Sequence, residues 1–389
     1  MSRPVAIVAG YLARYPLGGH LLSQYHFLAG LAKLGYEVVF AEHHGWSNAC
    51  YDPRTNTMSD DPTYGLSQIL PFFKSIGSRR WCYVDTAGKW HGLPQDDVRN
   101  LCRDAAFVAS VSSTTWLEEL RECNTRIFVD IDPGFTQFKM SPTPNASCPG
   151  YASPYDFNFH FTFGERIGQP DCPIPTHGLR WQPIRQPLAR ELIQPRFTPQ
   201  ARRFTTVMSW TAYGSMEYRG VTYGQKNLEM LKFLDLPRRT GEVFEIALGG
   251  VGAPAPQLQD AGWVITEALA ATGSVDAYLG YIGNSRGEFS VAKDGYVRTR
   301  CGWFSDRTVA YLASGKPVIV QDTGFREVLP CGEGLFAFQT ADDVVAAMEE
   351  IGRDYGRHCR AARRIAEDYF DSHKVLTAML TACDVPVPR

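Results

Sequence analysis

The 389-residue sequence has almost no net charge and no long run of lysine and arginine. It contains 39 Lys and Arg residues against 41 Asp and Glu residues, which gives a formal net charge of −2. Proteins that bind nucleic acid or an anionic membrane over a broad surface usually carry an excess of positive charge. The composition therefore gives no support to such a surface, although a local basic groove stays open.

Long hydrophobic runs and paired cysteines are also missing. No apolar stretch approaches the roughly 20 residues that a helix needs to cross a bilayer, and the first residues lack the cleavage pattern of a signal peptide. The ten cysteines are scattered without a Cys-x-x-Cys pair, so no zinc-ribbon or dithiol redox motif is present. We expect a cytoplasmic protein with no transmembrane segment, whose cysteines are mostly reduced.

What remains is the composition of an ordinary globular protein, with 44% hydrophobic and 21% charged residues. A chain of 389 residues exceeds what one hydrophobic core usually serves, so we expect two domains. The proline-rich stretch from residue 170 to about 200 has little periodicity and is the best candidate for their connection. The predicted parts are a first domain over residues 1–185, a second over 200–365 and a final helix over 366–389.

Both halves alternate apolar strands with amphipathic helices. Strands are predicted at residues 5–9, 37–41, 105–111, 126–131, 204–208, 243–248, 277–282 and 318–320. Helices are predicted at about 21–32, 114–121, 225–234, 344–351 and 358–383. This alternation predicts an α/β protein with parallel sheets and crossover helices.

The most informative segment is residues 303–325. Val309 and Leu312 fall on one face of a helix, Gly315 is placed to end it, and an apolar run typical of a strand buried on both faces follows. This segment resembles the donor-nucleotide segment of GT-B glycosyltransferases. The first strand, the flexible turn Gly18-Gly19 and the helix that follows look like the opening of the acceptor domain in the same superfamily.

The resemblance implies two Rossmann-like domains whose parallel sheets face each other across a cleft, with the final helix crossing back toward the first domain. It also implies transfer of a sugar, of the hexosyltransferase type, from a nucleotide-diphosphate donor such as a UDP-sugar to a hydroxyl or amine acceptor. The acceptor would be a small molecule or a glycan held by the first domain. The donor is a co-substrate, and no metal, further cofactor or nucleic acid is expected.

The second domain supplies most of the expected donor contacts. Lys226 precedes a helix, at a position resembling the cation that holds the donor diphosphate, where the alternative is a solvated lysine. The cation-rich loop at residues 287–303 stands where ligands of open α/β folds bind, and Tyr296 or Trp303 could stack on a base. The predicted donor-binding residues are Gly18, Gly19, Lys226, Glu288, Lys293, Arg300, Ser305, Asp306, Arg307, Thr323 and Gly324.

Three residues are predicted to be catalytic. His20 follows the Gly-Gly turn at a position resembling the general base of inverting GT-B enzymes, where the alternative is a helix cap or a packing residue. Asp85 and Asp130 each end an apolar strand and could be a base or an acceptor contact. Asp132 has the same options, but an Asp before Pro is also an ordinary turn residue.

One departure from the GT-B pattern matters. Many of these enzymes have a Glu five residues before the helix-ending Gly, where it grips the donor ribose, and this sequence has Ala310 there. Asp306, at the start of the same helix, is the expected substitute. The departure keeps two alternatives open: a sugar-nucleotide epimerase of the same fold, and a sugar-nucleotide-binding protein that has lost turnover.

Overall fold

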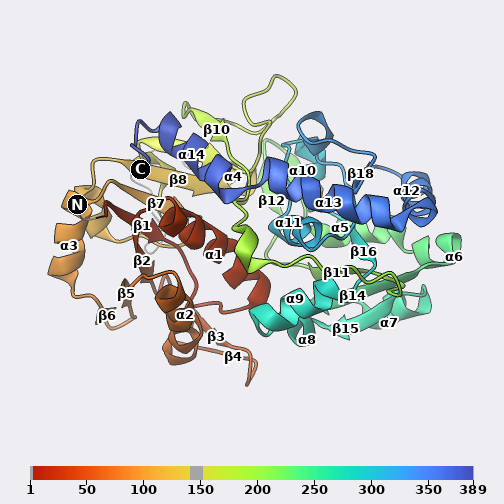
Figure 1. The fold of residues 1–389 in the computed structure, drawn as a ribbon, viewed down its shortest axis with the longest axis horizontal. Coiled ribbons are helices and arrows are strands. Elements are labelled where there is room, and N and C mark those ends of the chain that lie inside the picture. The colour runs from red at the N-terminus through yellow and green to blue at the C-terminus, as the bar shows by residue number, and fades with distance from the viewer. Residues whose placement is uncertain (1–2, 141–151, 389) are drawn as a thin grey trace.

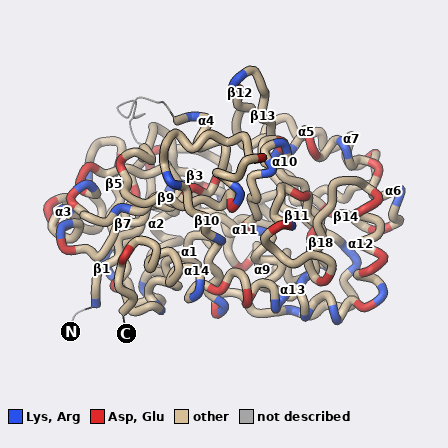
Figure 2. Tube along the Cα trace, turned by 90° about the horizontal axis from the view of Figure 1, so that it is seen from above, with Lys and Arg blue, Asp and Glu red and all other residues tan. Residues whose placement is uncertain are grey.

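The computed structural model describes residues 3–140 and 152–388. These residues form two Rossmann-like domains, each built around one sheet, which lie side by side in Figure 1. In the view of Figure 2, Lys and Arg are interspersed with Asp and Glu over both domains. No helix in the described part of the chain is both long and apolar enough to cross a membrane. A cytoplasmic location stays an expectation.

The first domain contains an eight-stranded sheet in the order β10-β9-β8-β7-β1-β2-β5-β6. Its strands are β1 (Val5–Ala9), β2 (Glu37–His43), β5 (Arg80–Val84), β6 (Trp90–Gly92), β7 (Phe107–Val111), β8 (Arg126–Asp130), β9 (Phe159–Thr162) and β10 (Trp181–Pro183). All neighbours are parallel except β5 and β6. Besides the sheet there are α1 (Gly18–Lys33), α2 (Thr63–Ser75), α3 (Gln95–Asp104), α4 (Phe135–Lys139) and the hairpin β3 (Cys50–Asp52) and β4 (Thr57–Ser59).

The second domain contains a six-stranded, fully parallel sheet in the order β15-β14-β11-β16-β17-β18. Its strands are β11 (Arg203–Ser209), β14 (Val243–Gly249), β15 (Val264–Glu267), β16 (Gly287–Ser290), β17 (Val318–Gln321) and β18 (Leu335–Phe338), and β12 (Met216–Tyr218) and β13 (Val221–Tyr223) form a separate hairpin. The helices are α5 (Lys226–Met230), α6 (Leu236–Thr240), α7 (Ala255–Asp260), α8 (Ala268–Thr272), α9 (Val275–Gly283), α10 (Asp294–Thr299), α11 (Asp306–Ala313), α12 (Ala341–Arg353) and α13 (Tyr355–Tyr369).

Both sheets are covered on their two faces. In β1, Ala6 and Val8 pack into the core that contains α1, whereas Ile7 and Ala9 pack into a second core on the other face. In β17, Val318 and Ile319 likewise belong to opposite cores and are fully buried. This explains why both strands are continuous apolar runs rather than alternating ones.

The C-terminal segment joins the two domains. Residues of α13 pack against α11 in the second domain, whereas Leu376 and Leu380 of α14 (Ser372–Ala382) pack into the core of the first domain. Figure 1 shows α14 lying over the first domain. The single helix predicted at 358–383 is therefore wrong, because the chain breaks at Phe370 and Asp371 to cross between domains. The Asp371 side chain then caps α14 by accepting a hydrogen bond from Lys374 N at 3.2 Å.

Two further predicted elements are wrong. Residues 277–282, expected as a strand, lie in helix α9, which Ser274 caps by accepting from Ala277 N at 3.1 Å. Tyr278 and Ile282 stand four residues apart and both face the core. The helix expected at 114–121 is reduced to a short 3-10 helix at Glu118–Glu122.

The strand orders place one switch point in each sheet. From β1 the chain builds outward through β2 and β5, then returns to β7 on the other side of β1. From β11 it builds through β14 and β15, then returns to β16 on the other side of β11. Ligands of open α/β sheets bind beyond the carboxyl ends of the strands at such points. A site is therefore expected where the ends of β1 and β7 meet the ends of β11 and β16.

Candidate active site

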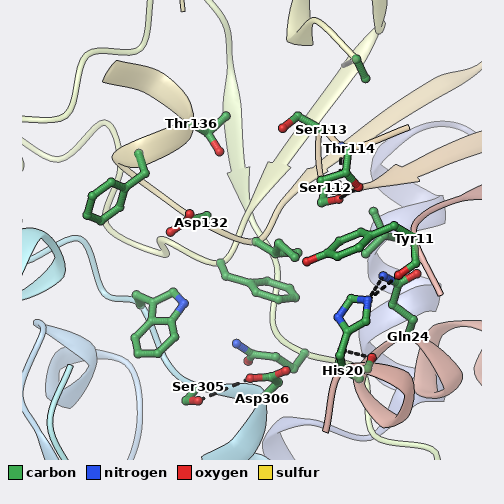
Figure 3. A pocket seen from close by; sticks show the side chains of 18 of the residues that line it. Tyr11, His20, Gln24, Ser112, Ser113, Thr114, Asp132, Thr136, Ser305 and Asp306 are labelled. Atoms are coloured by element: carbon green, nitrogen blue, oxygen red, sulfur yellow. Dashed lines mark hydrogen bonds between the residues drawn. The ribbon is translucent and has the colours of Figure 1, made fainter. Parts of the chain in front are cut away.

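A cavity of about 840 Å³ lies between the two domains at both switch points. The first domain contributes Tyr11, two residues after β1, and residues 112–114, which directly follow β7. The second domain contributes Lys226, which follows β11 and its hairpin, and Lys293, which follows β16. Figure 3 shows this cavity with side chains from both domains around it.

Lys226 is the first residue of α5 and lines the cavity. Within the described parts of the chain, its ammonium group has neither an ion pair nor a hydrogen bond. Burial lowers the pKa of Lys226 well below its ordinary value, and the positive charges of Arg307 and Lys293 lower it further. A bound anion would relieve both effects, so Lys226 is suited to hold a negatively charged group.

Lys293 also lines the cavity, but its charge is already paired across the domain boundary. Its Nζ donates to Asp132 Oδ1 at 2.9 Å and to the Tyr213 hydroxyl. The hydroxyls of Tyr213 and Tyr296 donate to the same carboxylate. Burial raises the pKa of Asp132, but Lys293 and the two tyrosines outweigh it, so the pKa ends below its ordinary value. One carboxylate of the first domain thus holds three groups of the second.

Arg307, the second residue of α11, lines the cavity, and hydrogen bonds from the interior of the second domain hold its guanidinium group in place. Its Nε donates to Glu288 Oε1 at 2.6 Å, and Nη1 donates to Val207 O at 2.9 Å. Glu288 does not line the cavity. Its side chain is fully buried, so the structure places it behind Arg307 rather than in reach of a ligand. The donor contact predicted for Glu288 is therefore at most indirect, through Arg307.

His20 lies on the first turn of α1 and lines the cavity. Its Nε2 is bonded to the Tyr11 carbonyl oxygen, and Gln24 Nε2 lies 3.4 Å from the same nitrogen (Figure 3). A carbonyl oxygen only accepts, so Nε2 carries the proton and Nδ1 keeps its lone pair. Burial lowers the pKa of His20, which keeps the imidazole neutral at pH 7. The side chain therefore has an unprotonated nitrogen available for proton transfer.

The other two predicted catalytic residues lie outside the cavity lining. Asp130 is buried at the end of β8 and accepts hydrogen bonds from Thr136, Gln137 and Thr162, which shape the loop that carries Asp132. Asp85 accepts from His91 Nε2 at 2.8 Å and from backbone N–H groups of the β5–β6 turn. Both carboxylates are occupied by hydrogen bonds that build local structure.

Gly18 and Gly19 form the first turn of α1 rather than a flexible turn, and neither lines the cavity. A Cβ atom on Gly18 would lie 2.1 Å from the Ser274 carbonyl oxygen, and one on Gly19 would lie 3.0 Å from the Tyr278 ring. These glycines let α1 of the first domain approach α9 of the second. The structure thus assigns them to the domain interface, in place of the donor contact predicted.

Three more predicted donor residues lie behind the cavity or away from it. Arg300 pairs with Glu327 at 2.7 Å on the surface. Thr323 O accepts from Gly302 N at 2.8 Å, and Gly324 N donates to Asp322 Oδ1 at 2.9 Å. Thr323 and Gly324 support the loop that presents Trp303 to the cavity, because the Thr323 hydroxyl also donates to Trp303 O at 2.5 Å.

The start of α11 forms part of the cavity wall, as expected. Ser305 and Asp306 line the cavity, as Figure 3 shows. Asp306 Oδ1 accepts from Arg307 N at 2.9 Å. Ala310, at the place of the missing Glu, is buried in the core and offers no polar group. Asp306 is therefore the carboxylate of α11 that a ligand in the cavity can reach.

The aromatic residues proposed to stack on a base are only partly free to do so. Tyr296 and Trp303 both line the cavity and stack on each other at 4.4 Å between ring centroids. Tyr296 is buried and donates its hydroxyl to Asp132. Only Trp303 keeps an exposed portion that a planar ligand could cover.

The cavity is also lined by residues that the sequence pattern does not predict as site residues, namely Tyr11, Trp46 and residues 112–114. Asp132 lines it too, although an Asp before Pro is typical of a turn. The sequence nevertheless contains a signal, because Tyr11 lies two residues after a predicted strand and Ser112 directly follows another. A predicted strand order would have identified both as switch-point residues.

The described residues contain no group of three or more His, Cys, Asp or Glu side chains arranged to hold a metal ion. Metal-independent chemistry stays a prediction.

Sequence comparison finds no relative, because neither a protein-family model nor a curated protein matches the chain significantly. Solved structures do resemble it. An alpha-glucosyltransferase in complex with UDP and a 13-mer DNA has a TM-score of 0.61 at 8% identity, over 99% of this chain and 100% of its own. A glycosyltransferase from Rickettsia africae has a TM-score of 0.55 at 9% identity, over 99% and 98%. Anabaena HepE, in complex with UDP and glucose, has a TM-score of 0.54 at 11% identity, over 97% and 99%.

Identities this low show a shared fold rather than a shared activity. The match covers nearly the whole length of both chains and therefore includes both domains. The chain therefore has the GT-B fold, which it shares with these glycosyltransferases.

Proposed function

We propose that the protein is a glycosyltransferase that moves a sugar from a nucleotide-diphosphate donor to a hydroxyl or amine group of an acceptor. The observation that carries this proposal is Lys226, whose amino group lines a switch-point cavity with neither an ion pair nor a hydrogen bond to a described residue. Asp132 pairs Lys293 and Glu288 pairs Arg307, whereas Lys226 has no such carboxylate partner. A diphosphate supplies the negative charge that this end of the cavity lacks.

The structural neighbours favour a particular donor to test. Among the structures that share the fold, the alpha-glucosyltransferase is in complex with UDP and DNA, and one structure of HepE is in complex with UDP-glucose. We infer that a UDP-sugar binds in the second-domain half of the cavity, with its diphosphate on Lys226 and its sugar hydroxyls near Asp306. Lys226 and Arg307 would then neutralise the charge that develops on the leaving diphosphate, which is the role that a metal ion has in other transferases.

The reaction would proceed as a displacement at the anomeric carbon. The acceptor oxygen or nitrogen forms a bond to this carbon, and the bond between the carbon and the diphosphate oxygen breaks. The nucleoside diphosphate leaves with the bonding electrons. The proton of the acceptor group passes to His20 Nδ1, the ring nitrogen whose lone pair is free.

Ala310 supports a second candidate. Because α11 lacks a carboxylate at this buried position, the grip on the donor ribose would be weaker, and the protein could bind a sugar nucleotide without transferring the sugar. An epimerase of the same fold is the other alternative, and no contact in the cavity favours it over transfer.

One experiment separates these functions. The full chain is incubated with UDP-glucose and a mixture of sugar and amine acceptors, in the presence of EDTA, and the products are followed by nuclear magnetic resonance. Transfer predicts free UDP together with a new glycosidic anomeric signal. A changed sugar configuration without a glycosidic product would indicate an epimerase, and calorimetric binding without any product would indicate a binding protein. Activity that EDTA abolishes would contradict the metal-independent mechanism.

A further inference from the structure

The first-domain wall of the cavity has chemistry of its own, which indicates the class of acceptor. We propose that the acceptor is a neutral sugar, free or at the end of a glycan, which stacks on Trp46 and hydrogen-bonds to the hydroxyl wall formed by Ser112, Ser113 and Thr114. This inference rests on the proposed function, because it assigns the half of the cavity that the donor does not occupy. It follows from three features of the wall.

The hydroxyl wall is held rigidly at the carboxyl end of β7. Ser112 adopts a left-handed backbone with φ of 82°, which is strained for a residue with a side chain. The turn is fixed from behind, because Ser112 O accepts from Ser110 Oγ, Ser113 O from Ala152 N and Thr114 O from Arg14 Nη2, each at 2.8 Å. Strain maintained by so many contacts keeps the three side chains in the cavity lining.

The three hydroxyl groups keep part of their hydrogen-bonding capacity for a ligand. Ser112 Oγ and Thr114 Oγ1 lie 2.8 Å apart and share one hydrogen bond, which leaves one donor and further lone pairs. The Ser113 hydroxyl bonds to no described residue. Figure 3 shows the three residues together on one side of the cavity. The wall therefore offers both donors and acceptors, which is what the hydroxyl groups of a sugar require.

An aromatic surface stands beside the hydroxyl wall. Trp46 lines the cavity with 43% of its surface exposed. The Arg14 guanidinium lies 5.1 Å from the Trp46 ring and 5.4 Å from the Tyr11 ring. Because the same Arg14 holds Thr114 O, it fixes the aromatic surface relative to the hydroxyls. A sugar ring can place its C–H face on an aromatic ring while its edge hydroxyls reach polar groups.

The charges of this wall argue against an anionic acceptor. Arg14 is buried, and its Nε lies 3.1 Å from Glu42 Oε1 in an ion pair. The two oxygens of Glu42 also accept from the backbone N–H groups of residues 12–14. Arg14 lies behind the cavity lining, and Lys139, the one Lys or Arg of the first-domain lining, lies over the Tyr213 ring at 4.9 Å. The hydroxyl wall itself therefore offers no unpaired cation to a phosphate or carboxylate.

An apolar acceptor fits no better. A lipid or another apolar group that covered the hydroxyl wall would remove water from three hydroxyls without replacing their hydrogen bonds, and such burial is unfavourable. A neutral sugar avoids both penalties. In the view of Figure 3, His20 lies between the hydroxyl wall and Asp306, where it could take a proton from an acceptor hydroxyl.

The test compares acceptors and variants in the same assay. Neutral mono- and oligosaccharides, the corresponding sugar phosphates and long-chain alcohols are offered with UDP-glucose, and UDP release above the rate of donor hydrolysis is measured. Trp46→Ala is expected to raise the acceptor KM about five- to a hundredfold through lost stacking, and Ser113→Ala about two- to tenfold through a lost hydrogen bond. Trp46→Phe should restore most of the affinity. The Kd for UDP should not change in any of them.

Two variants serve as controls. Phe197→Ala removes an exposed aromatic outside the cavity lining, and Ser75→Ala removes an exposed hydroxyl on α2. If Trp46→Ala does not fold, Ser113→Ala and the comparison of acceptors still decide. Sugar phosphates or alcohols that outperform neutral sugars, or an acceptor KM that is unchanged in both Trp46→Ala and Ser113→Ala, would overturn the inference while UDP binding keeps the proposed function standing. Failure of the wild-type chain to bind UDP would overturn the proposed function, and this inference with it.

Discussion

Two carboxylates separated by one residue differ in what they can do. Asp130 is buried among three side-chain donors, and burial raises its pKa, although those hydrogen bonds lower it in part. Asp132 faces the cavity, but its two oxygens are occupied by Lys293 and two tyrosine hydroxyls. Neither is well placed to accept a proton from a substrate. This leaves His20 as the titratable group of the first-domain lining with a free lone pair.

His20→Ala is expected to reduce turnover about a hundred- to ten-thousandfold, which is the usual cost of losing a general base. Donor binding should be nearly unchanged, because His20 holds no donor group in this mechanism. Since burial lowers the pKa of His20, its neutral form persists below pH 6.5, and the rate should fall only at more acidic pH. A pH–rate profile of the two proteins checks this. A wild-type acid limb above pH 6.5, or near-normal turnover in the variant, would exclude His20 as the base.

The sequence predicts that a residue lies at the site only where the residue stands at the end of a strand or the start of a helix. Lys226 was predicted at a helix start, and it is the first residue of α5. The positions of Glu288 and Arg300 relative to the cavity could not be predicted, because a strand or loop pattern does not say which way a side chain points. Glu288 turns toward Arg307 inside the domain, and Arg300 turns outward to Glu327.

Among the elements, α1 and α9 form a contact between the domains that depends on glycine. Gly18 starts α1 at the cap of α9, where there is no room for a side chain. Gly280 stands within α9, and a Cβ atom added there would have no neighbouring atom within 4 Å. The two glycines therefore offer a matched pair of substitutions with opposite expected effects.

Gly18→Ala is expected to destabilise the protein by about 1–3 kcal/mol, because the methyl group forces α1 away from the Ser274 carbonyl. Gly280→Ala should be neutral or stabilise by up to about 1 kcal/mol, since alanine favours the helix. Chemical denaturation of both variants checks the sign. Equal stability of Gly18→Ala and the wild type would show that the domains do not meet at this contact.

The elements that the sequence predicted well have a clear period or a clear cap. Residues 340–343 read Thr-Ala-Asp-Asp, a pattern that predicts a helix N-terminus, and Thr340 and Asp343 exchange hydrogen bonds at the start of α12. Residues 277–282 were misread because a short apolar run has the same pattern in a buried strand and in a buried helix. The cap at Ser274 and the packing of α9 favour the helix over the strand. Part of this packing comes from the first domain, because Leu22 of α1 belongs to the same core as Tyr278 and Ile282.

At the scale of the whole molecule, the two domains meet through several contacts. The α14 helix crosses to the first domain, α1 meets α9, Arg166 pairs with Glu327, and Asp132 binds Lys293 and two tyrosines beside the cavity. The contact of Asp132 is polar and lies at the site itself. Domain arrangement and ligand binding are therefore coupled through Asp132.

Asp132→Asn is expected to lower the unfolding midpoint by several degrees, because a hydrogen bond to a charged group contributes about 1.5–3 kcal/mol. The pKa of Asp132 lies below its ordinary value of 3.8 in the folded protein. The difference from wild type should thus be full above pH of about 4 and shrink as the pH falls through the folded pKa. Asp96→Asn, on a surface ion pair with Arg99, is the control. No difference at pH 7 would mean that the cluster does not hold the domains.

The central claim is that Lys226 binds the diphosphate of a sugar nucleotide, and calorimetric titration of UDP tests it most directly. Lys226→Met keeps the length of the side chain and removes its charge, while Lys74→Met does the same at an exposed position on α2. Lys226→Met should bind UDP about ten- to a hundredfold more weakly, a loss of about 1.5–3 kcal/mol, and Lys74→Met should bind like the wild type. Equal UDP affinity in the wild type and a correctly folded Lys226→Met, or no UDP binding by either, would contradict the claim.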